Sequence, residues 1–303
     1  MQTHFTSATE FADVMASLET NTADTPYTIR LNVDNIGSSL NSGSIGNIIR
    51  SNQKFVNLDL SGSNLTSIRQ DAFAYSVELT GITIPASVET IGDSAFAEAT
   101  ELSSVIFADG SQLETIDARA FQFTAITSIT IPASVTEIAV RAFSYNKNLT
   151  AITVHENNTN FSSQDGILYD RNQTTLIFAP EGLSGTVTIP ASVKTINGSS
   201  FSNCTSLNLT SVTFEQDSQL TTIGMYAFQG TTAIDIIEIP ASVTEMVTFS
   251  ELVPMPISHI FSGWTSSQTI IILGHPDQES ADEAWGGPYW RAGCNADIQY
   301  TGQ

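Results

Sequence analysis

The chain has 303 residues, of which 41% are hydrophobic and 14% are charged, so it can bury a sizeable core while Ser, Thr and Asn supply much of its polar surface. Ten basic residues stand against 31 acidic ones, and the net charge of −21 disfavours binding to nucleic acid or to an anionic membrane. The sequence contains no run of 18 apolar residues, which predicts that no segment spans a membrane.

Residues 1–54 are predicted to form an N-terminal helical cap region. Ser7 and Glu10 have the spacing of a capping box, and apolar residues follow at helical spacing: Phe11, Val14, Met15 and Leu18. A second helix is predicted over 43–51, ahead of the first strand, FVNLDL. Helices at this end would cover a strand edge that otherwise promotes aggregation.

Residues 55–303 repeat one short unit, and this repetition predicts a solenoid. Each copy is marked by an Ala-Phe or Ser-Phe pair, and the phenylalanines lie 22 to 27 residues apart except for one interval of 58. The phenylalanines of these pairs are Phe73, Phe96, Phe121, Phe143, Phe201 and Phe228. The long interval holds a variant repeat at 155–190, and segments 104–121 and 211–228 match each other at an offset of 107.

The pattern within one copy predicts how each turn folds. Alternating apolar residues such as Ile82 and Ile84 predict a short strand with one buried face, and in four copies a proline then ends the strand. A second apolar pair follows, and the next residue is predicted to turn the chain with a positive φ angle. The residues at this position in four copies are Gly92, Asp117, Asn197 and Gly224. The Ala-Phe pair then points inward, and the phenylalanines are expected to stack about 4.5–7 Å apart.

Residues 244–267 depart from this pattern, because the Ala-Phe pair expected after Met246 is missing, and Phe261 is the candidate for its displaced counterpart. Two interpretations of this irregular segment remain open: a loop packed on the solenoid, or an exposed apolar patch that receives a small hydrophobic ligand or a partner. The candidate residues of that patch are Val253, Met255, Ile257, Ile260, Phe261 and Trp264.

A C-terminal cap is predicted at about 284–303, where Trp285 and Trp290 are expected to close the end of the core rather than to bind sugar. Cys204 and Cys294 are predicted to be packed or partly exposed thiols, since a disulfide between them would have to join distant turns.

The sequence offers no pattern typical of catalysis. Its four histidines are scattered without metal-ligand spacing, and no nucleophile elbow, phosphate-binding loop or EF-hand occurs in the sequence. We therefore predict no enzymatic activity, no catalytic residue, no metal site and no cofactor.

The residues between the inward-facing strand residues are expected to form a column on the strand face, with neighbours about 4.8 Å apart. The column is mostly threonine, which is explained either by β-propensity or by contact with an extended partner. The candidate partner-contact residues are Asp59, Thr83, Ile106, Thr130, Thr153, Thr213 and Glu238, and Thr188 and Gln299 occupy the same column.

One pattern recurs among the repeats, in which IPASV is followed by isoleucine, a turn residue and Ala-Phe, with a period near 23 residues. This pattern resembles the repeats of the BspA-like (treponemal-type) leucine-rich-repeat proteins of bacteria. The segment FSSQDGILYDRNQTTLIFAP is similar to a variant repeat of that family. The resemblance implies an α+β solenoid, a right-handed superhelix with short parallel strands, a helical N-terminal cap and an aromatic-rich C-terminal cap. It also implies export to the periplasm or cell surface, with any signal or lipoprotein segment outside this sequence, and binding to proteins or host components.

The leading functional hypothesis is therefore a non-catalytic, adhesin-like protein whose partner is a protein or a host extracellular component. The alternative is a binder of a small hydrophobic ligand through residues 252–264. A polysaccharide lyase of parallel β-helix type would need acidic residues clustered with Lys or Arg on one face, and ice binding would need a strictly regular threonine array. The scattered basic residues argue against the lyase, and the uneven repeat spacing argues against ice binding.

Overall fold

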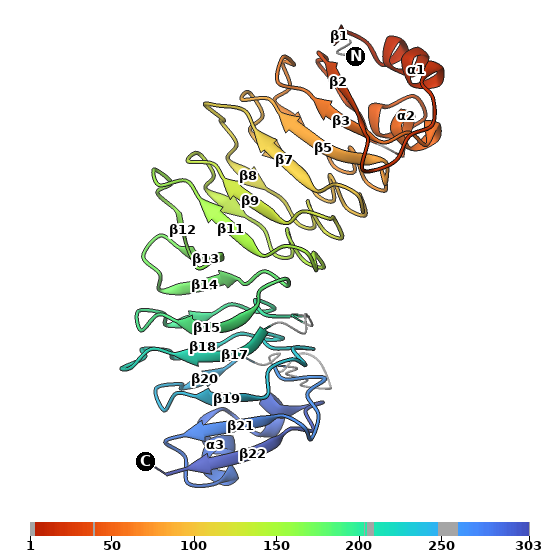
Figure 1. Ribbon diagram of the computed structural model, residues 1–303. Helices are drawn as coiled ribbons and strands as arrows, with labels where there is room; N and C mark the ends of the chain where they lie inside the picture. Colours follow the sequence, from red (N-terminus) through yellow and green to blue (C-terminus); the bar gives the residue numbers. More distant parts are fainter. Residues whose placement is uncertain (1–3, 39, 203, 205–208, 248–259, 303) are drawn as a thin grey trace. The chain divides into compact units, whose positions relative to one another are not determined.

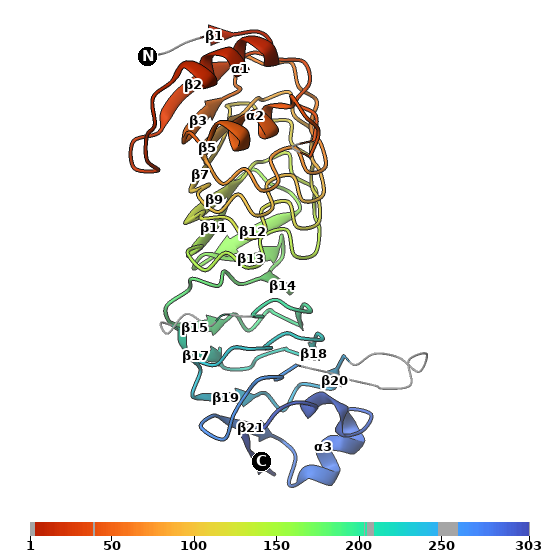
Figure 2. The ribbon, with the colours of Figure 1, turned by 90° about the vertical axis from the view of Figure 1, so that its right-hand side faces the viewer.

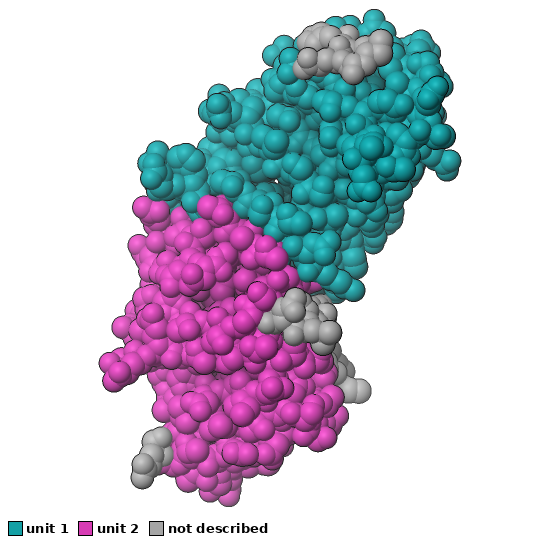
Figure 3. Space-filling model, in the orientation of Figure 1, with its two compact units in different colours: residues 1–149, 154–160 teal, residues 150–153, 161–303 magenta. Residues whose placement is uncertain are grey.

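The computed structural model describes residues 4–38, 40–202, 204, 209–247 and 260–302 (Figure 1). These residues form a β-solenoid, in which each turn contributes a short strand and strands of successive turns pair mostly in parallel. The chain divides into two compact units: unit 1 contains residues 1–149 and 154–160, and unit 2 contains residues 150–153 and 161–303 (Figure 3). Within the described residues, no helix is both long and apolar enough to cross a membrane.

Unit 1 begins with the two predicted helices, α1 (Ala8–Ser17) and α2 (Ile45–Asn52), which lie next to the first long strands (Figures 1 and 2). The Ser7 hydroxyl accepts a hydrogen bond from the Glu10 amide at 3.2 Å, as the capping box predicts. The Glu10 carboxylate accepts from the Thr6 amide at 3.0 Å, one residue earlier than the predicted partner. Phe11 and Met15 are fully buried, so α1 packs through its predicted apolar side.

The strand face of unit 1 is built by the first strand of each turn. Five strands pair in parallel in the order β1 (His4–Phe5), β2 (Tyr27–Leu31), β3 (Val56–Asp59), β5 (Leu79–Ile84) and β7 (Ser104–Phe107). The strand of the next turn is β9 (Ser128–Ile131), and β11 (Ala151–Val154) contains the division between the units. A second ladder joins four two-residue strands: β4 (Ser67–Ile68), β6 (Thr90–Ile91), β8 (Thr115–Ile116) and β10 (Glu137–Ile138).

Unit 2 repeats this plan after the variant repeat. Its strand face pairs β15 (Gly185–Ile189), β17 (Leu209–Phe214), β19 (Ile236–Ile239), β21 (Thr269–Leu273) and β22 (Asp297–Thr301). In the variant repeat, β12 (Phe161–Gln164), β13 (Ile167–Asp170) and β14 (Thr175–Phe178) pair antiparallel. From β14 a separate ladder of unit 2 runs in parallel through β16 (Thr195–Ile196), β18 (Thr222–Ile223) and β20 (Glu245–Met246).

The predicted phenylalanine column forms the core of both units. In unit 1 the rings of Phe73, Phe96, Phe121 and Phe143 stack at centroid distances of 5.3, 5.1 and 5.6 Å, each pair within 5° of parallel. In unit 2, Phe201 stacks on Phe228 at 5.1 Å, and Phe228 stacks on Phe261 at 5.5 Å. Phe261 is therefore the displaced counterpart that the sequence predicted.

Tryptophans close the C-terminal end of unit 2, where α3 (Gln278–Ala284) and a 3₁₀ helix (Pro288–Arg291) precede β22. The Trp264 ring meets Phe261 edge-on at 5.2 Å, and its indole nitrogen donates to the Phe228 carbonyl at 2.9 Å. Trp285 and Trp290 contact each other edge-on at 5.2 Å, and both are buried. The predicted plug of the core end is confirmed.

The predicted positive φ angle at the turn residues is wrong, because Gly92, Asp117, Asn197 and Gly224 do not adopt it. Positive φ occurs two residues later in each turn, at Asp71, Ser94, Arg119, Arg141, Ser199 and Tyr226. Glycine is needed at position 92 for space: a Cβ there would lie 2.7 Å from the backbone nitrogen of Gln70 in the preceding turn. At position 224 a Cβ would likewise collide with the backbone of Gly198.

The predicted boundary between a cap region and the solenoid at residue 54 stays a prediction. Strand β2, which lies before that boundary, already pairs in parallel with β3 after it.

Candidate functional site

The strand-face column of unit 1 lies in register across four strands. Arg30 of β2 pairs with Asp59 of β3, Asp59 pairs with Thr83 of β5, and Thr83 pairs with Ile106 of β7. Asp59 Oδ2 also accepts a hydrogen bond from Arg30 Nε at 2.8 Å and forms an ion pair with Arg30 Nη2 at 2.7 Å. Burial acts to raise the pKa of Asp59, but hydrogen bonds from Ser61 and Arg30 outweigh it and lower the pKa below its ordinary value.

The corresponding column of unit 2 has the same construction. Thr188 pairs with Thr213, and their hydroxyls lie 3.2 Å apart. Glu238 pairs with Ile271, and Ile271 pairs with Gln299 of the last strand. Because these side chains alternate with the buried ones, they lie on the face of the sheet opposite the core.

Most of the predicted column is open to solvent. Ile106 is 55% exposed, Thr83 and Asp59 are half-buried, and the other predicted members are exposed. Those exposed members are Thr130, Thr153, Thr188, Thr213, Glu238 and Gln299. Their position outside the core is as expected from the alternation, while their contact with a partner stays a prediction.

Two column members, Arg30 and Ile271, were not predicted. For Arg30 the signal was present in its strand, because YTIRL alternates apolar and polar residues with the same period of two as the other strands. TIIIL is apolar on both faces, so its register comes from pairing with β19 rather than from its own pattern.

The predicted apolar patch is wrong for the three candidates that the structure describes. Ile260, Phe261 and Trp264 are all fully buried, because Phe261 continues the phenylalanine column and Trp264 packs against it. These residues are core rather than exposed surface. Val253, Met255 and Ile257 lie outside the described residues.

The polar and titratable groups of the described residues are scattered. Among them, no group of three or more His, Cys, Asp and Glu side chains is arranged to hold a metal ion. Both cysteines are free thiols, Cys204 buried and Cys294 half-buried, and burial raises the pKa of both. The strand face therefore presents hydroxyls, a few carboxylates and isolated apolar side chains.

Comparison with known proteins places this geometry in a family. The family model of the BspA type leucine rich repeat region, in six copies, matches residues 66–178 and 176–251, which is more than half of the chain. A leucine-rich repeat protein from Eubacterium ventriosum is 31% identical, with a TM-score of 0.51, over 65% of this chain and 56% of that chain. Among curated proteins, none matches the chain.

Two further solved structures share the fold. A leucine rich cell surface protein from Faecalibacterium prausnitzii is 22% identical, with a TM-score of 0.55, over 91% of this chain and 79% of that chain. A leucine-rich repeat protein from Bacteroides ovatus is 18% identical, with a TM-score of 0.54, over 91% of this chain and 69% of that chain.

Proposed function

The chain belongs to the BspA-type leucine-rich repeat family, and we propose that it is a non-catalytic bacterial surface or exported protein that binds proteins or host components. The binding surface is the strand face, which gives the protein an adhesin-like role. The Faecalibacterium neighbour is a cell surface protein, and this supports the same location for the present chain.

The observation that carries the proposal is the exposed column in register across the strands. Solenoid proteins stack short turns so that single residues from many turns line one extended surface, which a partner can contact over several turns. Here the strand-face side chains change from turn to turn, as from the half-buried Thr83 to the exposed Ile106, while the phenylalanines of the core stay the same. The residues of such a surface can be adapted to one partner without changing the core residues that determine the fold.

The charge of the chain indicates the kind of partner. With 31 acidic and 10 basic residues, the chain attracts proteins with basic surfaces and repels nucleic acid and anionic membranes. Carboxylates on the strand face itself, such as Glu238, add to this preference.

The proposal is tested by a binding screen of the purified chain against extracellular-matrix proteins and glycans. We expect binding to at least one protein, and we expect the affinity to fall as ionic strength rises, since salt screens charge attraction. The variant Thr83→Lys reverses the local charge preference on the strand face, and we expect at least tenfold weaker binding from it. Glu101 is exposed and lies before β7, outside the strands. Glu101→Lys is therefore the matched control, and we expect it to leave binding unchanged.

A different result would overturn the proposal. If the chain bound none of these components but hydrolysed or cleaved one of the glycans, it would be an enzyme and the binding role would be wrong.

A further inference from the structure

Two turns of the solenoid depart from the common form in the same way. In most turns a short path joins the last residue of the strand to the second apolar pair, as from Ile84 to Val88. In the matching segments 104–121 and 211–228 this path runs from Phe107 to Leu113 and from Phe214 to Leu220. Each of the two paths is two residues longer. Each also ends its strand on phenylalanine, where the four turns with a proline after the strand have isoleucine.

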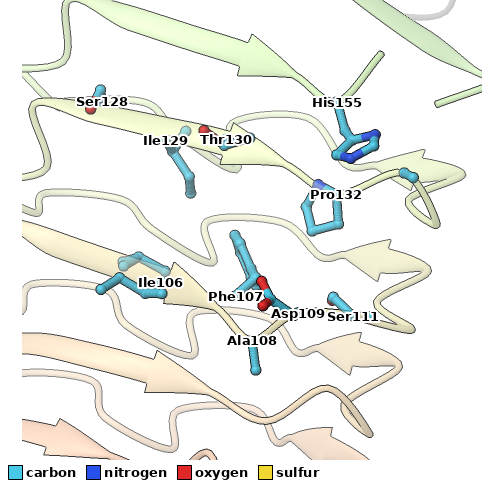
Figure 4. A pocket seen from close by; sticks show the side chains of 13 residues that line it. Ile106, Phe107, Ala108, Asp109, Ser111, Ser128, Ile129, Thr130, Pro132 and His155 are labelled. Carbon is cyan, nitrogen blue, oxygen red and sulfur yellow. The ribbon is translucent and has the colours of Figure 1, made fainter. Parts of the chain in front are cut away.

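A cleft lies beside the longer path in unit 1, with a volume of about 450 Å³. Phe107 and Asp109 lie on one side, Thr130 and Pro132 lie on the other, and His155 lies next to Pro132 (Figure 4). The cleft follows an interruption of the sheet: β7 is the last strand of its five-stranded ladder, and β9 of the next turn is not a member.

The interruption is confined to the strand face. On the other side of the same two turns, β8 and β10 pair through Thr115 and Glu137, and the Phe121 amide donates to the Ala142 carbonyl at 2.8 Å. The turns are thus held together behind the cleft while their strands β7 and β9 stand apart in front.

A second cleft of about 610 Å³ lies at the equivalent place in unit 2. Here β17 and β19 are in register only at Val212 and Ile237, whereas β18 and β20 of the same turns pair along their whole length. The linings correspond between the units: Phe107 with Phe214, Thr130 with Glu238, Pro132 with Pro240, and Ala133 with Ala241.

Each cleft exposes apolar surface that the common turns bury. Phe107 and Phe214 are half-buried, whereas Ile84, Ile131, Ile189 and Ile239 at the same position are at most 1% exposed. One isoleucine also projects beside each cleft, Ile106 at 55% exposure and Ile236 at 50%. Exposed aromatic and aliphatic surface in a concave site is what a partner's apolar side chain can cover.

Carboxylates line both clefts, one in the first and three in the second, and His155 also lines the first. Asp109 lines the first, and Glu215, Asp217 and Glu238 line the second. Among the described lining residues of either cleft there is no Lys or Arg. The complementary ligand therefore carries positive charge.

We propose that these two clefts are equivalent binding sites for an extended peptide that carries a large apolar side chain next to a lysine or arginine. The apolar side chain covers Phe107 or Phe214, and the basic side chain meets the carboxylates. Strand edges beside an interrupted ladder offer backbone groups to an extended peptide, which favours a peptide over a glycan. The inference rests on the proposed function and names the site and chemistry of the partner.

The test is a selection from a display library of random short peptides on the purified chain, followed by affinity measurement on synthetic copies of the selected peptides. We expect the selected peptides to combine an aromatic or aliphatic residue with an adjacent Lys or Arg. Asp109→Lys with Asp217→Asn changes the charge of both clefts, and we expect at least tenfold weaker binding. Asn is chosen at 217 because it tolerates the positive φ of 60° found there.

Two further variants complete the design. Ala133→Trp fills the unit 1 cleft, and we expect one of two binding sites to be lost in a titration. Glu101→Lys with Glu279→Lys changes two exposed carboxylates outside the clefts and leaves affinity within twofold. Thermal unfolding followed by circular dichroism confirms that each variant is folded.

The outcomes separate this inference from the proposed function. Selected peptides without basic residues, or equal affinities for cleft and control variants, overturn the inference. If a whole protein partner binds and is lost in Thr83→Lys but not in Asp109→Lys with Asp217→Asn, the strand face functions and the clefts do not. If the chain binds neither peptide nor protein, both proposals fail.

Discussion

The phenylalanine column and the strand face are two regions made by the same turns, yet they differ in how strictly the turns repeat. In unit 1 the column places a phenylalanine in every turn from Phe73 to Phe143, with ring distances that vary by only half an ångström. Across the same turns, the strand face carries a carboxylate, a threonine and an isoleucine at paired positions, Asp59, Thr83 and Ile106. The difference indicates that the column repeats strictly with the fold, while the strand face is free to vary from turn to turn, as the proposed binding role requires.

The largest effect is expected from breaking the column itself. Phe121 is fully buried between Phe96 and Phe143, so Phe121→Ala should cost about 3–5 kcal/mol of unfolding free energy, as truncations of core phenylalanine do. Phe123 lies two residues away, 38% exposed and stacked on Tyr145, and Phe123→Ala should cost about 1 kcal/mol. Urea unfolding of both variants measures the two values. Equal losses would mean that the column does not determine stability.

A smaller effect is expected from the close approach of two turns. Gly92→Ala places a methyl group 2.7 Å from the Gln70 backbone nitrogen, and the forced separation should cost about 1–3 kcal/mol. Ser94→Ala, at the position with positive φ, should change stability by no more than about 0.5 kcal/mol. Thermal unfolding compares them, and a Gly92→Ala variant as stable as the wild type would contradict the packing described here.

The smallest stability effect is expected at the surface ion pair of Arg119 and Asp93. The hydrogen bond from Arg119, at 2.7 Å, lowers the pKa of Asp93 although burial opposes it. Because the folded pKa lies below the unfolded value, this carboxylate stabilises the fold above its unfolded pKa, and that contribution is lost as pH falls through the folded pKa. The Arg119 side chain is 51% exposed and that of Asp93 is 35% exposed, so solvent screens the pair and its contribution to stability is small.

Arg119→Met should therefore raise the pKa of Asp93 toward its ordinary value and reduce the loss of stability in acid. A carbon-detected NMR titration of the Asp93 carboxyl follows the change. Arg141→Met, at the equivalent position one turn on, is the control and should leave this titration unchanged. Identical titrations of Asp93 in wild type and Arg119→Met would show that the ion pair is absent in solution.

Much of the column could be predicted from the sequence, because its signals are local and periodic. Even the displaced Phe261 was found, since the missing Ala-Phe pair left a gap that only a later aromatic residue could fill. Of the two interpretations left open for the segment with Trp264, the exposed patch was wrong for this residue, and hydrophobicity alone does not distinguish an exposed apolar side chain from a buried one. Trp264 is buried because it packs against Phe261 of the column.

Other features depend on neighbouring turns and could not be read from one turn alone. Glycine at 92 suggested positive φ, but the residue is small because the backbone of Gln70 approaches it. Likewise, alternation correctly directs Phe107 and Phe214 toward the core, while their partial exposure depends on the separation of their strands from the next ones. The longer path after each strand was the available signal for the two clefts.

The central claim, that the strand face carries binding while the phenylalanine column carries stability, is tested most directly by two matched lysine variants. Thr130→Lys changes an exposed residue of the strand face, and Val140→Lys changes a residue that is 72% exposed and lies outside it. Surface plasmon resonance against the partner found in the screen should give at least tenfold weaker binding for Thr130→Lys and unchanged binding for Val140→Lys. The unfolding free energies of both variants should stay within about 0.5 kcal/mol of wild type. Equal binding by the two variants would contradict the account.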